Sequence, residues 1–143
     1  MKTFIIALAV FIILPFQSVR AATPEEQARF LTAVRQAFDK QDTNAIFTFV
    51  CWEGVAVKDT DGLKKMLVSE ITEMKVSDMT LVDPDPKVPD VWKDEDGIAY
   101  HLNLPVTKRL RVIFAPGGHF GSDMAPVGEK DGKLYLLGPI PIK

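Results

Sequence analysis

The chain has 143 residues, a formal net charge of −2, 47% apolar residues and a single cysteine. This length fits one domain, and the charge lacks the basic excess that nucleic-acid-binding proteins usually carry. One cysteine excludes an internal disulfide and a thiolate-cluster metal site, and two histidines leave little for a histidine-rich one. We therefore expect no nucleic-acid partner, no metal and no cofactor.

The N-terminus is predicted to be a secretory signal peptide over residues 1–21. Lys2 supplies a positive start, residues 4–14 form an unbroken apolar run, and Pro15 ends that run. A helix that spans a bilayer needs about 20 apolar residues, and this run is well short of that length. The pattern therefore favours a cleaved export signal over a membrane anchor.

Cleavage is expected after Ala21, because Val19 and Ala21 place small or apolar residues at the −3 and −1 positions; cleavage after Ala22 is the alternative. The remaining chain, residues 22–143, is predicted to be a single domain, periplasmic or secreted and without membrane attachment. In such a protein Cys51 is a lone thiol. Its place in an apolar run favours a buried, inert side chain over a link between two chains.

Two helices are predicted directly after the signal peptide. Thr23 and Glu26 form a capping box for a helix from Pro24 to Lys40, in which apolar residues recur at helical spacing. A second, shorter helix, capped by Asp42 or Thr43, is expected to run as far as Cys51. Gly54 is a plausible stop after it, because glycine commonly ends helices.

A short strand is predicted over residues 55–57, and a turn over residues 59–62 follows it. Thr60 or Asp61 can cap a third helix from this turn. The spacing predicts one apolar face and one solvated face for this helix. The apolar set is Leu63, Met66, Leu67, Ile71 and Met74, and the solvated set is Lys64, Lys65, Glu70 and Glu73.

After Met74 the hydrophobic period changes from helical spacing to two, which is typical of strands. Strands are predicted over residues 76–82 and 98–104, separated by a long proline-rich, acidic loop over residues 83–97. In the next strand Leu110, Val112 and Phe114 are expected to face the core, with Arg109, Arg111 and Ile113 on the opposite face.

The last predicted strands form a hairpin, residues 125–129 and 133–137, around the turn Lys130-Asp131-Gly132. Leu134 and Leu136 are expected to face the core. The tail, residues 138–141, has prolines at two positions and is not expected to extend the ladder regularly.

This element order resembles the nuclear transport factor two-like superfamily (the cystatin-like cone). The resemblance rests on the first helix, the short helix ending at Cys51-Trp52, the strand 55–57, the helix start at Asp61-Gly62 and the four later strands. It implies an α+β fold in which three N-terminal helices pack on a curved antiparallel sheet of four to five strands. In that superfamily the cone encloses an apolar pocket; some members are isomerases or dehydratases, and many are binding or assembly modules. The long loop 83–97 departs from the pattern.

Two aromatic residues are predicted to bind a ligand. Trp52 ends the second helix where a cone would have its rim, so it could form a ligand wall; the alternative is a core plug under the first helix. Tyr100 is expected on the core-facing side of its strand. A ketosteroid-isomerase-like site would pair such a tyrosine with an acid, but the apolar positions of this strand and the next one offer none. No residue is assigned as catalytic.

The remaining polar candidates are given structural roles. His101 is expected on an outer sheet face, solvated or in a dimer interface, and His119 lies in a glycine-rich loop with no nucleophile placed near it by a motif. The acidic segment 90–97 lacks the acids of a calcium-binding loop. Arg109 and Arg111 are expected to pair with acids such as those of this segment, or across subunits.

The sequence therefore favours a non-enzymatic exported domain that binds a small apolar ligand or a protein partner, with a homodimer through the outer sheet face around Ile113. The alternative is a small-molecule enzyme, isomerase-like or hydrolase-like, that uses a cone-shaped pocket. Buried ionisable groups with shifted pKa values would favour the enzyme. A fully packed interior would favour a structural or interaction role.

Overall fold

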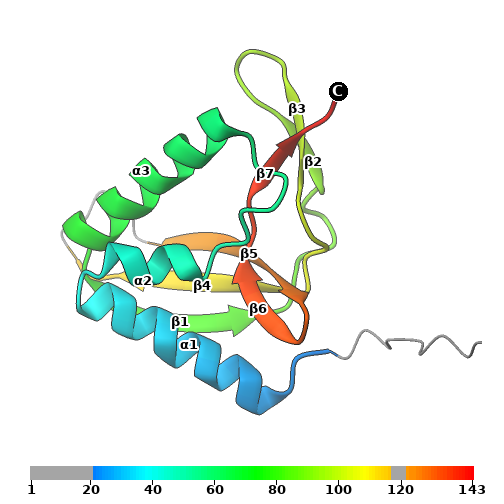
Figure 1. Cartoon of the computed structure of the whole chain (residues 1–143). Helices are drawn as coiled ribbons and strands as arrows, with labels where there is room; N and C mark the ends of the chain where they lie inside the picture. Colours follow the sequence, from blue (N-terminus) through cyan, green and yellow to red (C-terminus); the bar gives the residue numbers. More distant parts are fainter. Residues whose placement is uncertain (1–20, 117–121) are drawn as a thin grey trace, which may run out of the picture.

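The fold is α+β, with the helices before the strands, as the sequence predicts (Figure 1). The computed structural model describes residues 21–116 and 122–143, so the predicted signal peptide and His119 lie outside the described residues. The helices are α1 (Pro24–Asp39), α2 (Thr43–Thr48) and α3 (Val57–Glu73). The strands are β1 (Val76–Val82), β2 (Val91–Lys93), β3 (Ala99–Leu102), β4 (Lys108–Phe114), β5 (Ser122–Lys130), β6 (Lys133–Leu136) and β7 (Pro139–Pro141).

The capping box predicted for α1 is confirmed. The Thr23 hydroxyl accepts a hydrogen bond from the Glu26 backbone N–H at 3.2 Å, and the Glu26 carboxylate accepts one from the Thr23 N–H at 2.6 Å. Pro24 occupies the first turn, where its missing N–H has no cost. The helix then buries one face through Phe30, Val34, Ala37 and Phe38.

Of the two predicted caps for α2, Asp42 is the one used: its carboxylate accepts a hydrogen bond from the Ala45 N–H at 2.9 Å. The helix ends at Thr48, before the predicted Cys51, because the next residues pair with β6. Val50 forms a parallel bridge with Leu136, and the Cys51 N–H donates to the Leu136 carbonyl at 2.9 Å. Cys51 is an unpaired, buried thiol, which confirms the prediction of its burial.

The predicted strand over residues 55–57 is wrong. The Val55 N–H donates to the Trp52 carbonyl at 3.2 Å, which closes a local turn, and Val57 is already the first residue of α3. The expected caps Thr60 and Asp61 therefore lie inside the helix. The residue at the N-cap is Ala56, and it provides no side-chain hydrogen bond.

Four antiparallel strands form the large sheet, in the order β1-β4-β5-β6, which curls strongly around the helices (Figure 1). The strand predicted over residues 76–82 is confirmed as β1. Leu110, Val112 and Phe114 of β4 are buried as predicted. The hairpin between β5 and β6 is confirmed too: Asp131 and Gly132 both have positive φ, 52° and 72°, as its tight turn requires.

The small sheet, in the order β2-β3-β7, is a feature that the sequence reading missed. β2 lies within the segment predicted as a loop, and β7 lies within the tail that was not expected to pair. β7 tolerates its prolines because it is an edge strand, where one side needs no N–H donors. In the antiparallel pairing of β3 with β7, Tyr100 lies opposite Pro141 and Leu102 lies opposite Pro139.

Asn103 joins the small sheet to the rest of the fold. Its amide donates to the carbonyls of Cys51 at 2.7 Å and Glu53 at 3.1 Å, and its side-chain oxygen accepts from the Gly138 N–H at 3.1 Å. Three chain segments therefore meet on one side chain. Gly138 is required at this point, because a Cβ there would lie 2.5 Å from a Val55 methyl carbon.

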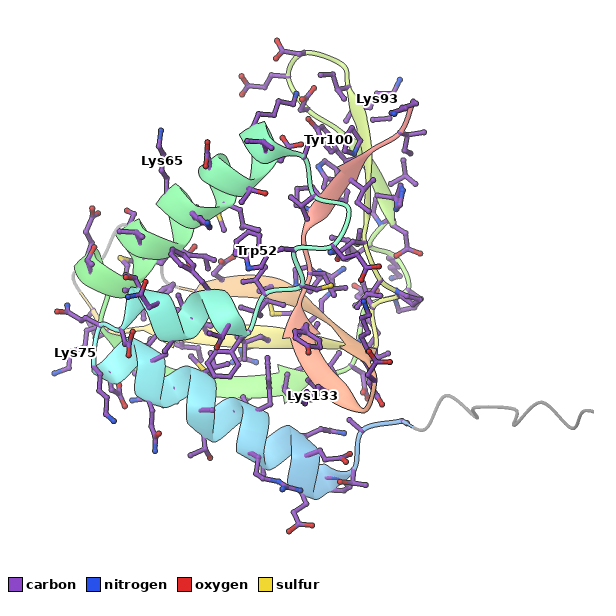
Figure 2. All side chains as sticks on the ribbon, viewed as in Figure 1. Trp52, Lys65, Lys75, Lys93, Tyr100 and Lys133 are labelled. Atoms are coloured by element: carbon purple, nitrogen blue, oxygen red, sulfur yellow. The ribbon has the colours of Figure 1, made fainter. Side chains whose placement is uncertain are left out.

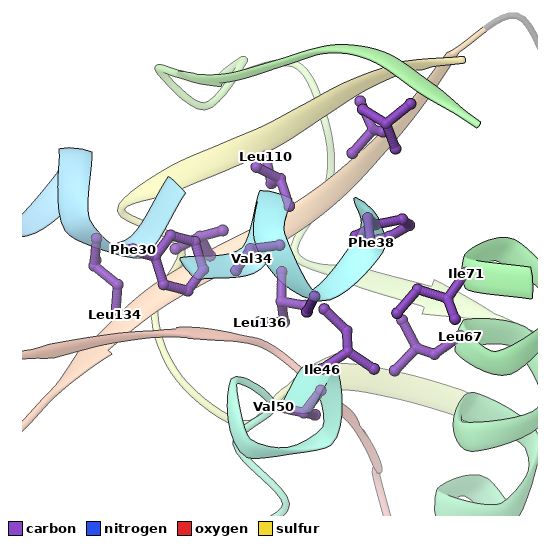
Figure 3. Packing of buried hydrophobic residues seen from close by; sticks show 14 of the residues in the cluster. Phe30, Val34, Phe38, Ile46, Val50, Leu67, Ile71, Leu110, Leu134 and Leu136 are labelled. Atoms are coloured by element: carbon purple, nitrogen blue, oxygen red, sulfur yellow. The ribbon is translucent and has the colours of Figure 1, made fainter. Parts of the chain in front are cut away.

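The hydrophobic core lies between the helices and the inner face of the large sheet (Figure 3). The largest fully buried side chains come from all of these layers: Ile46, Ile71, Leu110, Val34 and Val127. No polar or charged residue is fully buried within the described part of the chain. No helix there is long and apolar enough to cross a membrane.

Candidate functional site

An apolar groove of about 240 Å³ lies between α3 and β5, with the end of β6 at its floor. The bottom of this groove consists of core residues, and its walls come from α3 and β5. It is lined by Val50, Leu63, Met66, Leu67, Asp123, Met124, Ala125, Pro126, Leu136 and Leu137. Asp123 is the one charged residue in this set.

The α3 wall exists because the helix is not fully covered. Leu63, Met66 and Leu67 share a face at helical spacing, as predicted. However, Met66 was expected to be buried and is 48% exposed, and α3 buries only Leu67 and Ile71. The physical reason is that α3 packs mainly on α2, so the side of the helix that faces β5 stays open.

The β5 wall is fixed by strand register. Val112 lies opposite Asp123, and Leu110 lies opposite Ala125. Directly opposed residues point to the same face of a sheet, and Leu110 and Val112 are buried. Asp123 and Ala125 therefore lie on the core side of the sheet, where Ala125 is partly buried, whereas Asp123, at the start of β5, is exposed. The sequence reading placed Asp123 in the glycine-rich loop, but it belongs to β5.

Glu70 and Asp123, the carboxyl pair, interact at one end of the groove: Asp123 lines it, and Glu70 lies on α3 beside the lining residues without being one of them. Glu70 follows Met66 by four residues and Leu67 by three, so it lies on the same face of α3. Burial raises the pKa of Glu70 from 4.5 to about 7, and the negative charge of Asp123 and a hydrogen bond with it add to the shift. Glu70 was predicted to face water, and that prediction is wrong: it is half-buried.

Trp52 packs at the junction of α2 and α3 (Figure 2). Its indole N–H donates to the Phe47 carbonyl at 2.9 Å, and the two rings meet edge to face at 6.2 Å. The Lys64 ammonium lies 5.5 Å from both ring centroids. The residue is partly buried against the core and is not among the groove residues.

Tyr100 is buried on β3, near the start of α3 (Figure 2). Its ring stacks on Trp92 with 5.9 Å between centroids. Burial raises the pKa of its hydroxyl, and a hydrogen bond with Lys58 acts in the opposite direction. The two predicted ligand-binding residues therefore have separate surroundings. Their role in ligand binding stays a prediction.

The other polar candidates have mostly structural contacts. The Asp94 carboxylate accepts from the Ile98 N–H at 2.8 Å within a turn. His101 is exposed, with its Nδ1 2.8 Å from the Leu102 carbonyl oxygen. Within residues 21–116 and 122–143, Arg109 forms no ion pair, and its Nε is buried without a partner. The cation of β4 that does pair is Lys108, with Asp83 at 2.5 Å.

Two further observations bear on the choice of site. A larger hollow of about 480 Å³ lies between α1, α2 and β6, and its charged lining includes the exposed residues Arg29 and Lys133. No group of three or more histidine, cysteine, aspartate or glutamate residues in the described ranges is arranged to hold a metal ion. The groove differs from the hollow in its apolar lining and in the neighbouring Glu70, whose pKa is raised.

No family model, curated protein or solved structure matches the chain. The chemistry of the groove is therefore the basis for a functional proposal. The sequence did contain a signal for its acidic end. Glu70 lies at helical spacing from Met66 and Leu67, which places it at the edge of the apolar face rather than opposite to it.

Proposed function

We propose that the protein is an exported, non-enzymatic binding protein that holds a small apolar ligand in the groove between α3 and β5. The observation that carries this proposal is the apolar lining of the groove, together with the exposed side chain of Met66. Each square ångström of apolar surface removed from water contributes about 25 cal/mol. A ligand that covers the α3 and β5 walls therefore gains free energy from surface that the fold leaves open.

Export is part of the proposal and rests on the predicted signal peptide, residues 1–21. The buried thiol of Cys51 agrees with it, because an inert cysteine needs no reducing compartment. Three helices on a curled sheet also support the expected likeness to the nuclear transport factor two-like superfamily. In that superfamily the cone encloses an apolar pocket, and the groove proposed here is also apolar and lies between a helix and the sheet.

The test uses octanol as a neutral apolar probe and native mass spectrometry as the measurement. We expect the protein to carry one octanol molecule and the variant Ala125→Phe to carry none, because the larger side chain fills the groove. Ala28→Phe is the matched control, since Ala28 is exposed on α1 and outside the groove. It should bind as the parent does.

Loss of the adduct in both variants, or no adduct in the parent, would count against the groove. Melting curves check that each variant folds. If Ala125→Phe does not fold, Met66→Glu serves instead, because that position is already 48% exposed and tolerates a charge. The charge should exclude octanol from the apolar lining.

A second candidate function is a small-molecule enzyme, and one observation favours it. A general base works best when its pKa lies near the working pH, and burial beside Asp123 raises the pKa of Glu70 to about 7. In that case Glu70 would take a proton from a ligand seated in the groove. Chemical conversion of the bound molecule separates this candidate from simple binding.

A further inference from the structure

We infer that the ligand of this groove is a small alkylamine, with its chain on the apolar lining and its ammonium group against the carboxyl pair Glu70–Asp123. This inference rests on the proposed function and adds the chemical class of the ligand. It stands on the shape of the groove and on the position of the two acids. Charge complementarity selects a cation over the other head groups.

The groove has one polar end. Asp123 lines the groove directly, and the rest of the lining is apolar. Glu70 reaches Asp123 from α3, one helical turn beyond Met66 and Leu67. A ligand whose chain lies along Leu63 and Met66 thus has its head beside two carboxyl groups, one from each wall.

Among the described residues, the charged groups around the pair supply no cation to it. Lys64 is held over the Phe47 and Trp52 rings, toward α2. Arg111 lies opposite Met124 in the β4–β5 register, so its side chain starts on the outer face of the sheet. Glu73, the next acid along α3, is exposed. The helix α2, Thr43–Thr48, has no ionisable side chain.

Within residues 21–116 and 122–143, no lysine, arginine or histidine forms an ion pair with Glu70 or Asp123. Two neighbouring carboxyl groups in a partly apolar setting cannot both ionise without cost. With its pKa raised to about 7, Glu70 is partly protonated near neutral pH and can donate to Asp123, whose Oδ1 also accepts from the Met124 N–H at 2.7 Å. The proton on Glu70 therefore reduces the repulsion between the two carboxyl groups, as a bound cation would.

An ammonium group can take the place of that proton. It donates charge-assisted hydrogen bonds to carboxylates, which are roughly twice as strong as neutral ones. On binding, the proton of Glu70 passes to solvent and the ammonium keeps its own protons. A carboxylate head group would be repelled by Asp123, and a hydroxyl would gain less than a cation.

Binding is then linked to pH. An opposite charge placed close to a carboxyl group lowers its pKa by roughly one to three pH units. The free protein has Glu70 half-protonated near neutral pH, whereas an alkylamine, like lysine, stays charged up to about pH 10. Below neutral pH the amine must displace a proton, so its affinity is lower there and rises with pH. The expected rise from about pH 5.5 to about pH 8.5 is at least about tenfold.

The experiment is isothermal titration calorimetry of the full chain with octylamine, octanol and octanoate. Octylamine is expected to bind at least about tenfold more tightly than octanol at about pH 8.5, and octanoate is expected not to bind. Near neutral pH, titrations in buffers of different ionisation enthalpy should count about half a proton released per octylamine bound. Octanol should release none.

The variant Glu70→Gln is expected to lower the ratio of octylamine to octanol affinity and to remove its rise between about pH 5.5 and about pH 8.5, because Asp123 alone remains to attract the ammonium. Glu73→Gln is the matched control: it lies one turn further along α3, is exposed, and should keep the ratio. If Glu70→Gln does not fold, Asp123→Asn and the proton count on the parent protein test the same point.

The outcomes separate the inference from the proposed function. If octanol binds as tightly as octylamine, or if octylamine binding is independent of pH, the inference fails and the apolar groove remains. If neither compound binds, the proposed function fails with it. If Glu73→Gln lowers the ratio as much as Glu70→Gln, general surface charge and not the carboxyl pair explains the preference.

Discussion

The helices α1 and α3 are nearly equal in length, 16 and 17 residues, yet they differ in capping and in how many residues they bury. The first begins with a capping box and buries four residues on its inner face. The second begins at Ala56 without a side-chain cap, contains Gly62, and buries two. Both are amphipathic in sequence, so amphipathic spacing alone does not determine how far a helix is buried.

The difference lies in what each helix meets. α1 packs on β1, on β6 and on α2 (Figure 1), so its apolar face is closed from several directions. α3 packs mainly on α2 and leaves Met66 and Val68 in contact with solvent. Weakly packed elements open at lower free energy than core elements. We therefore expect α1 to be the more stable helix and α3, which forms one wall of the proposed binding groove, to open more readily.

The largest expected effect comes from truncating one apolar side chain on each helix. Phe30→Ala on α1 should lower the free energy of unfolding by about 3–5 kcal/mol, because Phe30 is 7% exposed and contacts Phe49 edge to face. Met66→Ala on α3 should cost less than about 1 kcal/mol, since nearly half of its side chain is already in water. Urea denaturation measures both. Equal losses would remove the contrast between the helices.

A smaller effect is expected from the cap of α1. Thr23→Ala removes the hydroxyl that accepts the Glu26 N–H, and such losses cost about 1 kcal/mol. Thr60→Ala is the matched change on α3. It should cost less, because Thr60 lies within α3 and not at its N-cap. Thermal melting of the two variants checks this order, and a greater loss for Thr60→Ala would contradict it.

The smallest expected effect has the opposite sign. Gly62 lies inside α3, and a Cβ at this position would meet nothing within 4 Å. Gly62→Ala should therefore stabilise the protein by about 0.5–1 kcal/mol, because alanine loses less backbone entropy in a helix. Gly132→Ala is the control, since its φ of +72° is strained for a side chain, and it should destabilise. If Gly62→Ala lowered the denaturation midpoint as Gly132→Ala does, contacts of α3 other than its backbone entropy would determine the effect.

Several elements could be predicted from the sequence because local chemistry decides them. Thr23 and Glu26 bond to each other, and the hairpin at Asp131-Gly132 needs only two positive φ angles. These features depend on residues a few positions apart. Their prediction requires no knowledge of the tertiary structure.

The remaining features depend on partners far along the chain. β2 is a strand because β3 lies beside it, and β7 pairs only because the chain returns to β3. The spacing of Glu70 indicates only that it lies at the edge of the apolar face of α3, whereas its interaction with Asp123 joins residues that are far apart in the chain. Trp52 and Tyr100 were predicted as ligand-binding residues because they are aromatic. Glu70, the acid at the edge of the apolar face, was predicted to face water.

The pairing of β7 with β3 also affects when the small sheet can form during synthesis of the chain. Residues 139–141 complete the small sheet, and Gly138 closes the contact with Asn103 just before them. A growing chain that has not yet reached these residues leaves the edge of β3 unpaired, and unpaired edges invite pairing with other chains. The small sheet can be completed only after residue 141 has been synthesised, later than every strand of the large sheet.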